Sequence, residues 1–212
     1  MIDDAPIGAF LDDVASERVT PAGGTVVAVS GAMGAALCEM ACIHTIAARS
    51  TEDDPDSDEP EIDDFEAIRA DLAGQRRRLL ALAEQDATLV DELFGGGSSG
   101  SPSGSASVSA DRLSKRAAGI PLATAEASLA VLEAAAVVGN HGRIGVAADA
   151  KAGAYLADAA LRASLATVRT NIEALEDTSY AAKLEERGAQ IAATAADVRR
   201  DVLSEPFDGM DD

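Results

Sequence analysis

The sequence contains no tryptophan, few other aromatic residues and few basic ones. Aromatic residues make up 3% of the 212 positions, and 17 Lys and Arg residues stand against 37 Asp and Glu residues, for a formal net charge of −20. A surface this acidic repels nucleic acid and anionic lipid, so neither is expected as a partner. Abundant alanine with so few aromatic residues disfavours a β-sheet and predicts an all-α fold. The acidic, lysine-poor composition also indicates adaptation to high salt, which screens self-repulsion.

Cysteine is scarce as well. The two cysteines, Cys38 and Cys42, lie one turn apart on one predicted helix, where a disulfide would have poor geometry. We therefore expect buried thiols in a reducing compartment. The amino terminus has neither the basic nor the apolar region of a secretory signal, so we expect a cytoplasmic protein. Because Cys38, Cys42 and His44 do not share one helical face, we expect no metal site.

What the chain does contain is a long run of small residues at 20–49. Pro21 and the pair Gly23 and Gly24 interrupt any earlier helix, and Thr25 is a candidate N-cap for the next one. Small residues recur at helical spacing through the run, so another backbone or a flat ligand can come close to one face. The glycine turn places free N–H groups at the helix start, which favours an anion there.

This run is long enough to cross a membrane, but Glu39 and His44 interrupt it and its apolarity comes mostly from Ala and Gly. The central helix of a soluble bundle is the better interpretation. A lone His on such a helix is more often a core residue than a catalytic base, so His44 is only a weak candidate for the site.

The rest of the chain predicts a single-domain bundle of five to six helices over residues 1–205, with the small-residue helix at its centre. Gly119 and Pro121 predict a joint between two of the helices, with Pro121 in the first turn of the second. The expected irregular segments are an acidic loop at 50–64, a Gly/Ser-rich loop at 95–107 and a frayed tail at 206–212.

One carboxylate lies on the apolar stripe of the long helix that follows the acidic loop. Asp86 falls four residues after Leu82 and three before Leu89, so it points where the leucines point. Because a buried charge must be paired or hydrated, Asp86 either pairs with an arginine or caps a neighbouring helix, or it faces a polar cleft and takes part in chemistry. Asp149 is a second carboxylate in apolar surroundings, since it lies near the start of an otherwise apolar small-residue helix at 147–168.

Several short motifs follow one another along the chain. They are Pro21-Ala22-Gly23-Gly24-Thr25, Glu84-Gln85-Asp86-Ala87, Ile120-Pro121-Leu122 with Glu126, Gly139-Asn140 with Asp149, and Val168-Arg169-Thr170-Asn171-Ile172. In order and spacing they resemble the cyclodeaminase/cyclohydrolase family of folate metabolism, over roughly residues 10–192. Ala22 and Thr25 depart from the Pro-Gly-Gly-Gly-Ser turn of that family but keep its N–H groups and hydroxyl. About three extra residues separate Asn140 from Asp149.

The resemblance implies a homodimeric enzyme with sites near the subunit contact, acting on a tetrahydrofolate derivative without a further cofactor. Two reactions are open: hydrolysis of 5,10-methenyltetrahydrofolate to 10-formyltetrahydrofolate, or loss of ammonia from the 5-formimino compound. Hydrolysis is preferred only because no formiminotransferase domain accompanies this sequence. Both reactions involve a cation and proton transfer, so we expect Asp86 and Asp149 to act as a catalytic pair.

The resemblance also implies further contacts to the folate. The N–H groups at the helix start would bind a carbonyl, an oxyanion or the glutamate tail. Arg169 and Lys151 would bind the tail carboxylates, and the Asn171 side chain would form hydrogen bonds with the pterin ring. The expected substrate-binding residues are Gly23, Gly24, Thr25, Lys151, Arg169 and Asn171. The competing class is a non-catalytic helical binding or dimerisation module, which would tolerate Asp86→Asn without loss of ligand binding.

Overall fold

The computed structural model describes residues 6–50, 62–95 and 104–203. A π-helical turn, η2 (Asp91–Gly95), and a 3₁₀ turn, η3 (Ile144–Val146), accompany the α-helices. No strand occurs within the described ranges, and the all-α prediction is confirmed. The α-helices are α1 (Ile7–Val14), α2 (Gly23–Arg49), α3 (Ile62–Val90), α4 (Gly104–His141), α5 (Ala147–Ile172) and α6 (Thr178–Leu203).

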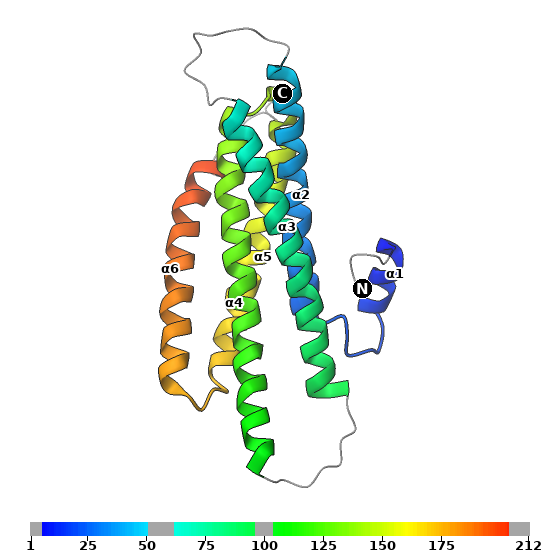
Figure 1. The fold of residues 1–212 in the computed structure, drawn as a ribbon, viewed down its shortest axis with the longest axis vertical. Coiled ribbons are helices and arrows are strands. Elements are labelled where there is room, and N and C mark those ends of the chain that lie inside the picture. The colour runs from blue at the N-terminus through cyan, green and yellow to red at the C-terminus, as the bar shows by residue number, and fades with distance from the viewer. Residues whose placement is uncertain (1–5, 51–61, 96–103, 204–212) are drawn as a thin grey trace, which may run out of the picture.

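Helices α2 to α5 run alternately up and down along the long axis of an elongated bundle (Figure 1). Helix α6 lies on the outside against α4 and α5, and the short α1 stands apart from the bundle. Helix α2 is central because it packs against α3, α4 and α5. Its buried residues are all small: Thr25, Ala28, Gly31, Ala32, Gly34, Ala35, Cys38, Ala41, Cys42 and Thr45.

Helices α2 and α5 touch through their backbones. A Cβ atom on Gly34 would lie 2.7 Å from the carbonyl oxygen of Gly153, and one on Gly153 would lie 2.8 Å from the carbonyl oxygen of Gly34. Next to this contact, the Sγ atom of Cys38 lies 3.7 Å from the carbonyl oxygen of Ala150. Cys38 and Cys42 are both free and buried, as the sequence predicts.

Helix α4 continues without a break through Gly119 and Pro121, so the predicted joint is wrong. Pro121 has no N–H group to offer the carbonyl of Ala117, four residues earlier. The side chain of Asn171 donates to that carbonyl instead, with an Nδ2–O distance of 2.6 Å. Because this substitute donor comes from α5, no local pattern around Pro121 could indicate it.

Three other local expectations are also wrong. Helix α2 begins at Gly23 with Ala22 as its N-cap, so Thr25 lies inside the first turn and is not the cap. His44 is exposed and is not part of the core. Residues 104–107 of the predicted Gly/Ser-rich loop belong to α4.

The two predicted loops fall largely outside the described residues, at 51–61 and 96–103, and so does the tail after 203. Within the acidic segment, the structure assigns Ile62 and the two residues after it to α3.

Ion pairs join neighbouring helices of the bundle, and two of them involve partly or fully buried side chains. Arg199 of α6 contacts Asp158 Oδ1 of α5 through Nε at 2.9 Å and Nη2 at 2.5 Å. Arg76 of α3 contacts Glu39 of α2 at 2.9 Å. Glu39, which interrupts the apolar run of α2, is thus a paired residue between helices.

Two helices, Gly23–Arg49 and Ala110–His141, are long and apolar enough to cross a membrane by length and composition alone. About half of the apolar window in each is buried inside the bundle, 44% and 50% respectively. A central bundle helix meets the same criteria, so this finding is weak evidence for a membrane span.

Candidate active site

The carboxylate of Asp86 meets the first turn of α2. The Oγ1 atom of Thr25 donates a hydrogen bond to Asp86 Oδ2 at 2.8 Å, and the backbone N–H of Thr25 donates to the same carboxylate. Thr25 is completely buried, and Asp86 is half-buried. The protein's own carboxylate therefore occupies the anion position that the glycine turn predicts. Asp86 does cap a neighbouring helix, which was one of its two expected roles.

Gly24 provides the space for this carboxylate. A Cβ atom on Gly24 would lie 2.7 Å from the carboxyl carbon of Asp86 and 2.8 Å from its Oδ2 atom. Any larger residue would displace the carboxylate. Gly23 is different, because it is exposed and an added Cβ atom would meet nothing within 4 Å.

Burial raises the pKa of Asp86 above its ordinary value, although the two hydrogen bonds from Thr25 act in the opposite direction. For a carboxylate that only caps a helix at the surface, such hydrogen bonds would dominate and the pKa would fall. Here desolvation dominates, so Asp86 takes up a proton at a higher pH than an ordinary aspartate. A half-buried carboxylate with a raised pKa is suited to general acid–base catalysis.

The second predicted carboxylate, Asp149, lies far from Asp86 in the same chain. It belongs to the first turn of α5, next to Ala150, whose carbonyl contacts Cys38 of α2. Cys38 is thirteen residues beyond Thr25, which corresponds to about 20 Å along a helix. The two carboxylates therefore do not form a pair within one chain, and Lys151 lies at the Asp149 end.

The remaining predicted residues lie elsewhere on the bundle. Arg169 lines a cavity of about 550 Å³ between α5 and α6, whose walls also carry Glu173 and Glu185. The amide nitrogen of Asn171 binds the carbonyl of Ala117. No hydrogen bond or ion pair between described residues joins Arg169 or Asn171 to Asp86.

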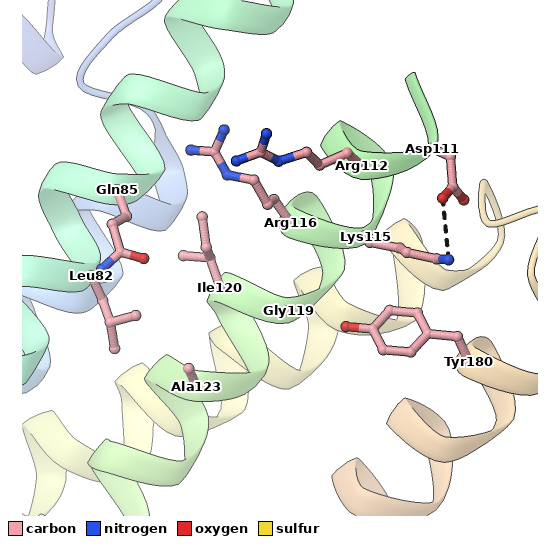
Figure 2. Close-up of a pocket in the computed structure, with 10 residues that line it drawn as sticks. All are labelled: Leu82, Gln85, Asp111, Arg112, Lys115, Arg116, Gly119, Ile120, Ala123 and Tyr180. Atoms are coloured by element: carbon pink, nitrogen blue, oxygen red, sulfur yellow. Dashed lines mark ion pairs between the residues drawn. The ribbon is translucent and has the colours of Figure 1, made fainter. Parts of the chain in front are cut away.

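A second pocket, of about 540 Å³, lies between α3, α4 and α6 and was missed from the sequence (Figure 2). Arg112, Lys115 and Arg116 of α4 line it, opposite Gln85 of α3 and beside Tyr180 of α6. Gln85 directly precedes Asp86 in the chain. The sequence did carry a signal, because two arginines one helical turn apart are unusual in a chain with so few basic residues.

In the part of the chain that the structure describes, no group of three His, Cys, Asp or Glu side chains could hold a metal ion. The two thiols are also unsuited to nucleophilic chemistry. Burial is the main cause that raises the pKa of Cys38 to about 12 and that of Cys42 to about 11. Both thiols therefore stay protonated near neutral pH.

Comparison with known proteins gives three results. The formiminotransferase-cyclodeaminase family model matches residues 6–190. The chain is 31% identical over 182 residues to a methenyltetrahydrofolate cyclohydrolase from Methylorubrum extorquens, and the match covers 82% of this chain and 83% of that protein. The crystal structure of formiminotetrahydrofolate cyclodeaminase from Thermotoga maritima superposes with a TM-score of 0.77 at 22% identity, covering 95% of this chain and 98% of that one.

Proposed function

Because the chain belongs to the formiminotransferase-cyclodeaminase family, we propose that it is an enzyme of folate one-carbon metabolism that hydrolyses 5,10-methenyltetrahydrofolate to 10-formyltetrahydrofolate. The family match spans most of the chain, and the bacterial relative named for this reaction aligns over 82% of it. The observation that carries the chemistry is the contact of Asp86 with Thr25 and Gly24.

The first step of the hydrolysis needs a base and a stabilised cation. The methenyl carbon lies between two nitrogens that share one positive charge, and water attacks this carbon. The ionised carboxylate of Asp86 stabilises the cation and accepts a proton from the attacking water. Its raised pKa makes it a stronger base than an ordinary aspartate, and Thr25 fixes its orientation by the hydrogen bond to Oδ2.

The second step opens the ring. The bond between the former methenyl carbon and N5 breaks, N5 takes up a proton, and the hydroxyl group on that carbon loses its proton to solvent as it becomes the formyl carbonyl on N10. Protonated Asp86 can return its proton to N5, so one group serves as base and then as acid. Overall, the cationic substrate and water yield the neutral formyl product and one proton.

The cyclodeaminase reaction is compatible with the same site. There, Asp86 would protonate the leaving amine of the 5-formimino compound, and its carboxylate would then face the same methenyl cation. The structure that superposes on this chain carries that name, but at 22% identity it supports the fold alone. Hydrolysis remains the proposal because the 31% identical relative is named for it.

A homodimer would supply the second carboxylate. Asp86 lies at the start of α2 and Asp149 level with its middle, so an antiparallel pairing of two bundles through α2 and α5 would bring Asp149 of one copy toward Asp86 of the other. The exposed face of these helices is apolar, since Met33 is 50%, Ile43 44% and Tyr155 52% exposed. Apolar faces of this kind are typical of subunit contacts.

We propose that the protein works in the cytoplasm at a high salt concentration. The acidic excess of the sequence favours a concentrated salt solution, where counterions screen the repulsion between carboxylates. The two free, buried cysteines are compatible with a reducing compartment.

The direct test is an absorbance assay with 5,10-methenyltetrahydrofolate in concentrated KCl. We expect the methenyl chromophore to disappear faster than in the uncatalysed reaction, and Asp86→Asn to lower kcat by about 10²–10⁴-fold, the usual contribution of a general acid–base group. Ammonia release from the 5-formimino compound without hydrolysis would establish the cyclodeaminase instead. A folded protein inactive on both substrates would favour the binding module.

The shared site has its own test. Asp86→Asn and Asp149→Asn are each expected to be inactive as homodimers. If Asp149 acts across the subunit contact, a purified heterodimer of the two variants contains one intact site and recovers about half of the wild-type activity. A heterodimer as inactive as its parents would show that the two residues do not complete one site across the subunit contact, and an active Asp149→Asn homodimer would show that Asp149 is not catalytic.

A further inference from the structure

The pocket between α3, α4 and α6 gathers three basic side chains in a protein of net charge −20. Lys115 is held by Asp111 and Asp177, each at 3.1 Å. Arg116 contacts Glu92 through Nη1 at 2.7 Å. Arg112 has no ion-pair partner among the described residues. Asp111, Asp177 and Glu92 balance the three basic groups in charge, but the Arg112 guanidinium itself is not engaged and can bind a ligand anion.

The two arginines are arranged to bind an anion together. Arg112 and Arg116 extend side by side toward α3, where Gln85 lies opposite them (Figure 2). Two neighbouring guanidinium groups repel each other unless anions compensate them, and Glu92 compensates only Arg116. Guanidinium groups match the planar geometry of carboxylates and donate two parallel hydrogen bonds to them.

The floor of the same pocket is apolar and partly aromatic. In Figure 2, Leu82, Ile120 and Ala123 lie below the arginines, and the Tyr180 ring lies to one side below Lys115. The Nζ atom of Lys115 is 5.6 Å from the centre of this ring. An apolar floor with a few converging polar groups is typical of small-molecule sites. The combination fits an aryl group that carries carboxylates.

We propose that this pocket binds the p-aminobenzoyl-glutamate part of the folate, with glutamate carboxylates at Arg112 and Arg116. The inference rests on the proposed function and assigns the tail to these two residues in place of Arg169 and Lys151. Gln85 faces the pocket and Asp86 faces α2, so the two sites lie on adjoining sides of α3. An extended folate has its reacting carbon at the pterin end and its carboxylates at the other end. It could therefore place the reacting carbon at Asp86 and its carboxylates at Arg112 and Arg116.

The test measures binding and turnover separately. Calorimetry at constant KCl concentration measures the affinity of the pocket for p-aminobenzoyl-triglutamate, a fragment that cannot react. We expect Arg112→Ala to weaken binding about tenfold, which one charge-assisted hydrogen bond accounts for. Arg112→Lys should recover part of the loss. Arg77→Ala removes an exposed arginine of α3 outside the pocket and serves as the matched control.

Turnover then distinguishes a tail site from a general effect. Arg112→Ala should raise KM for 5,10-methenyltetrahydrofolate triglutamate about tenfold, leave its kcat unchanged and leave KM unchanged for the methenyl-tetrahydropteroate that lacks glutamate. Equal changes for both substrates, or unaltered binding of the triglutamate fragment, would overturn the proposal.

Sulfate serves as the probe for a site that takes any anion. If sulfate at fixed ionic strength binds as tightly as the fragment and in an Arg112-dependent way, the pocket is a general anion site and the tail assignment is wrong. Wild-type protein that binds the fragment through Arg112 but hydrolyses neither substrate would refute the proposed reaction while supporting the pocket.

Discussion

Two glycines of helix α2, Gly24 and Gly34, each lie close to another part of the protein, but the groups that they contact differ. At its start, Gly24 leaves space for the carboxylate of Asp86. At its middle, Gly34 leaves space for the backbone of α5 at Gly153. The first neighbour is the end of a short side chain, which can rotate away. The second is main chain, which can move only if two helices separate. The same glycine-to-alanine change should therefore impair chemistry at one contact and stability at the other.

Among the glycine changes, the largest effect is expected for Gly24→Ala. Its Cβ atom would lie 2.7 Å from the carboxyl carbon of Asp86, so the carboxylate must rotate out of its position. We expect kcat to fall by about 10²-fold or more, as for a misplaced acid–base group, with a change of less than about 1 kcal/mol in the free energy of unfolding. The methenyl assay and urea unfolding measure the two quantities.

Gly23→Ala is the matched control for this change. It lies in the same turn, where alanine keeps the backbone N–H and an added Cβ atom meets nothing within 4 Å, so it should retain wild-type activity. A fully active Gly24→Ala enzyme would mean that the position of the Asp86 carboxylate does not matter to the reaction.

Gly34→Ala should mainly affect stability. Alanine normally stabilises a helix relative to glycine by about 1 kcal/mol, but here its Cβ atom would lie 2.7 Å from the carbonyl oxygen of Gly153. We expect the free energy of unfolding to fall by about 1–3 kcal/mol, as in other overpacked cores. Urea unfolding tests this prediction.

Gly74→Ala on α3 is the matched control, and it should change the free energy of unfolding in the opposite direction. No atom lies within 4 Å of an added Cβ there, so the alanine should stabilise the protein by up to about 1 kcal/mol. If both alanine variants were stabilised equally, the close approach of α2 and α5 would be disproved.

Thr25→Val should have a smaller effect, visible in the pH dependence. The hydroxyl of Thr25 lowers the pKa of Asp86, so its removal raises that pKa further. The base form is then lost at a higher pH, and the acid limb of the kcat/KM profile moves upward in pH, while the rate at pH values well above this limb stays close to that of the wild type. Thr25→Ser keeps the hydroxyl and should retain the wild-type profile.

The same pKa has a consequence for stability. Because burial raises the pKa of Asp86 in the folded state, that state binds the proton more strongly than the unfolded chain does. The contribution of this group to the free energy of unfolding is therefore largest at low pH and is lost as the pH rises through the raised pKa. In Asp86→Asn this part of the pH dependence should be absent from urea unfolding curves.

Sequence reasoning found the all-α bundle and its central helix because periodicity and residue size act within one segment. It also found Asp86, since a carboxylate on a leucine stripe is visible in one helix alone. It could not show that Asp149 lies level with the middle of α2, far from Asp86, because periodicity reports which side of a helix is buried but not which neighbour lies opposite. The pocket at Arg112 was missed for the same reason, as its walls come from three helices.

The joint predicted at Pro121 is the clearest failure of local reasoning. The rule that proline interrupts a helix rests on an unsatisfied carbonyl, here that of Ala117. Asn171 satisfies this carbonyl from another helix, so α4 remains continuous. The family resemblance assigns Asn171 to a pterin contact, whereas in the structure its amide nitrogen donates to Ala117 inside the protein.

The backbone contact between Gly34 and Gly153 also bears on how the protein is made. A ribosome completes α2 long before it reaches α5, so the side of α2 that will face α5 remains uncovered on the nascent chain while α3 and α4 are added. That surface consists of small residues and offers little apolar area for an unwanted partner to bury. A central helix built from alanine and glycine can therefore remain exposed until α5 is synthesised with less risk of aggregation than one built from leucine.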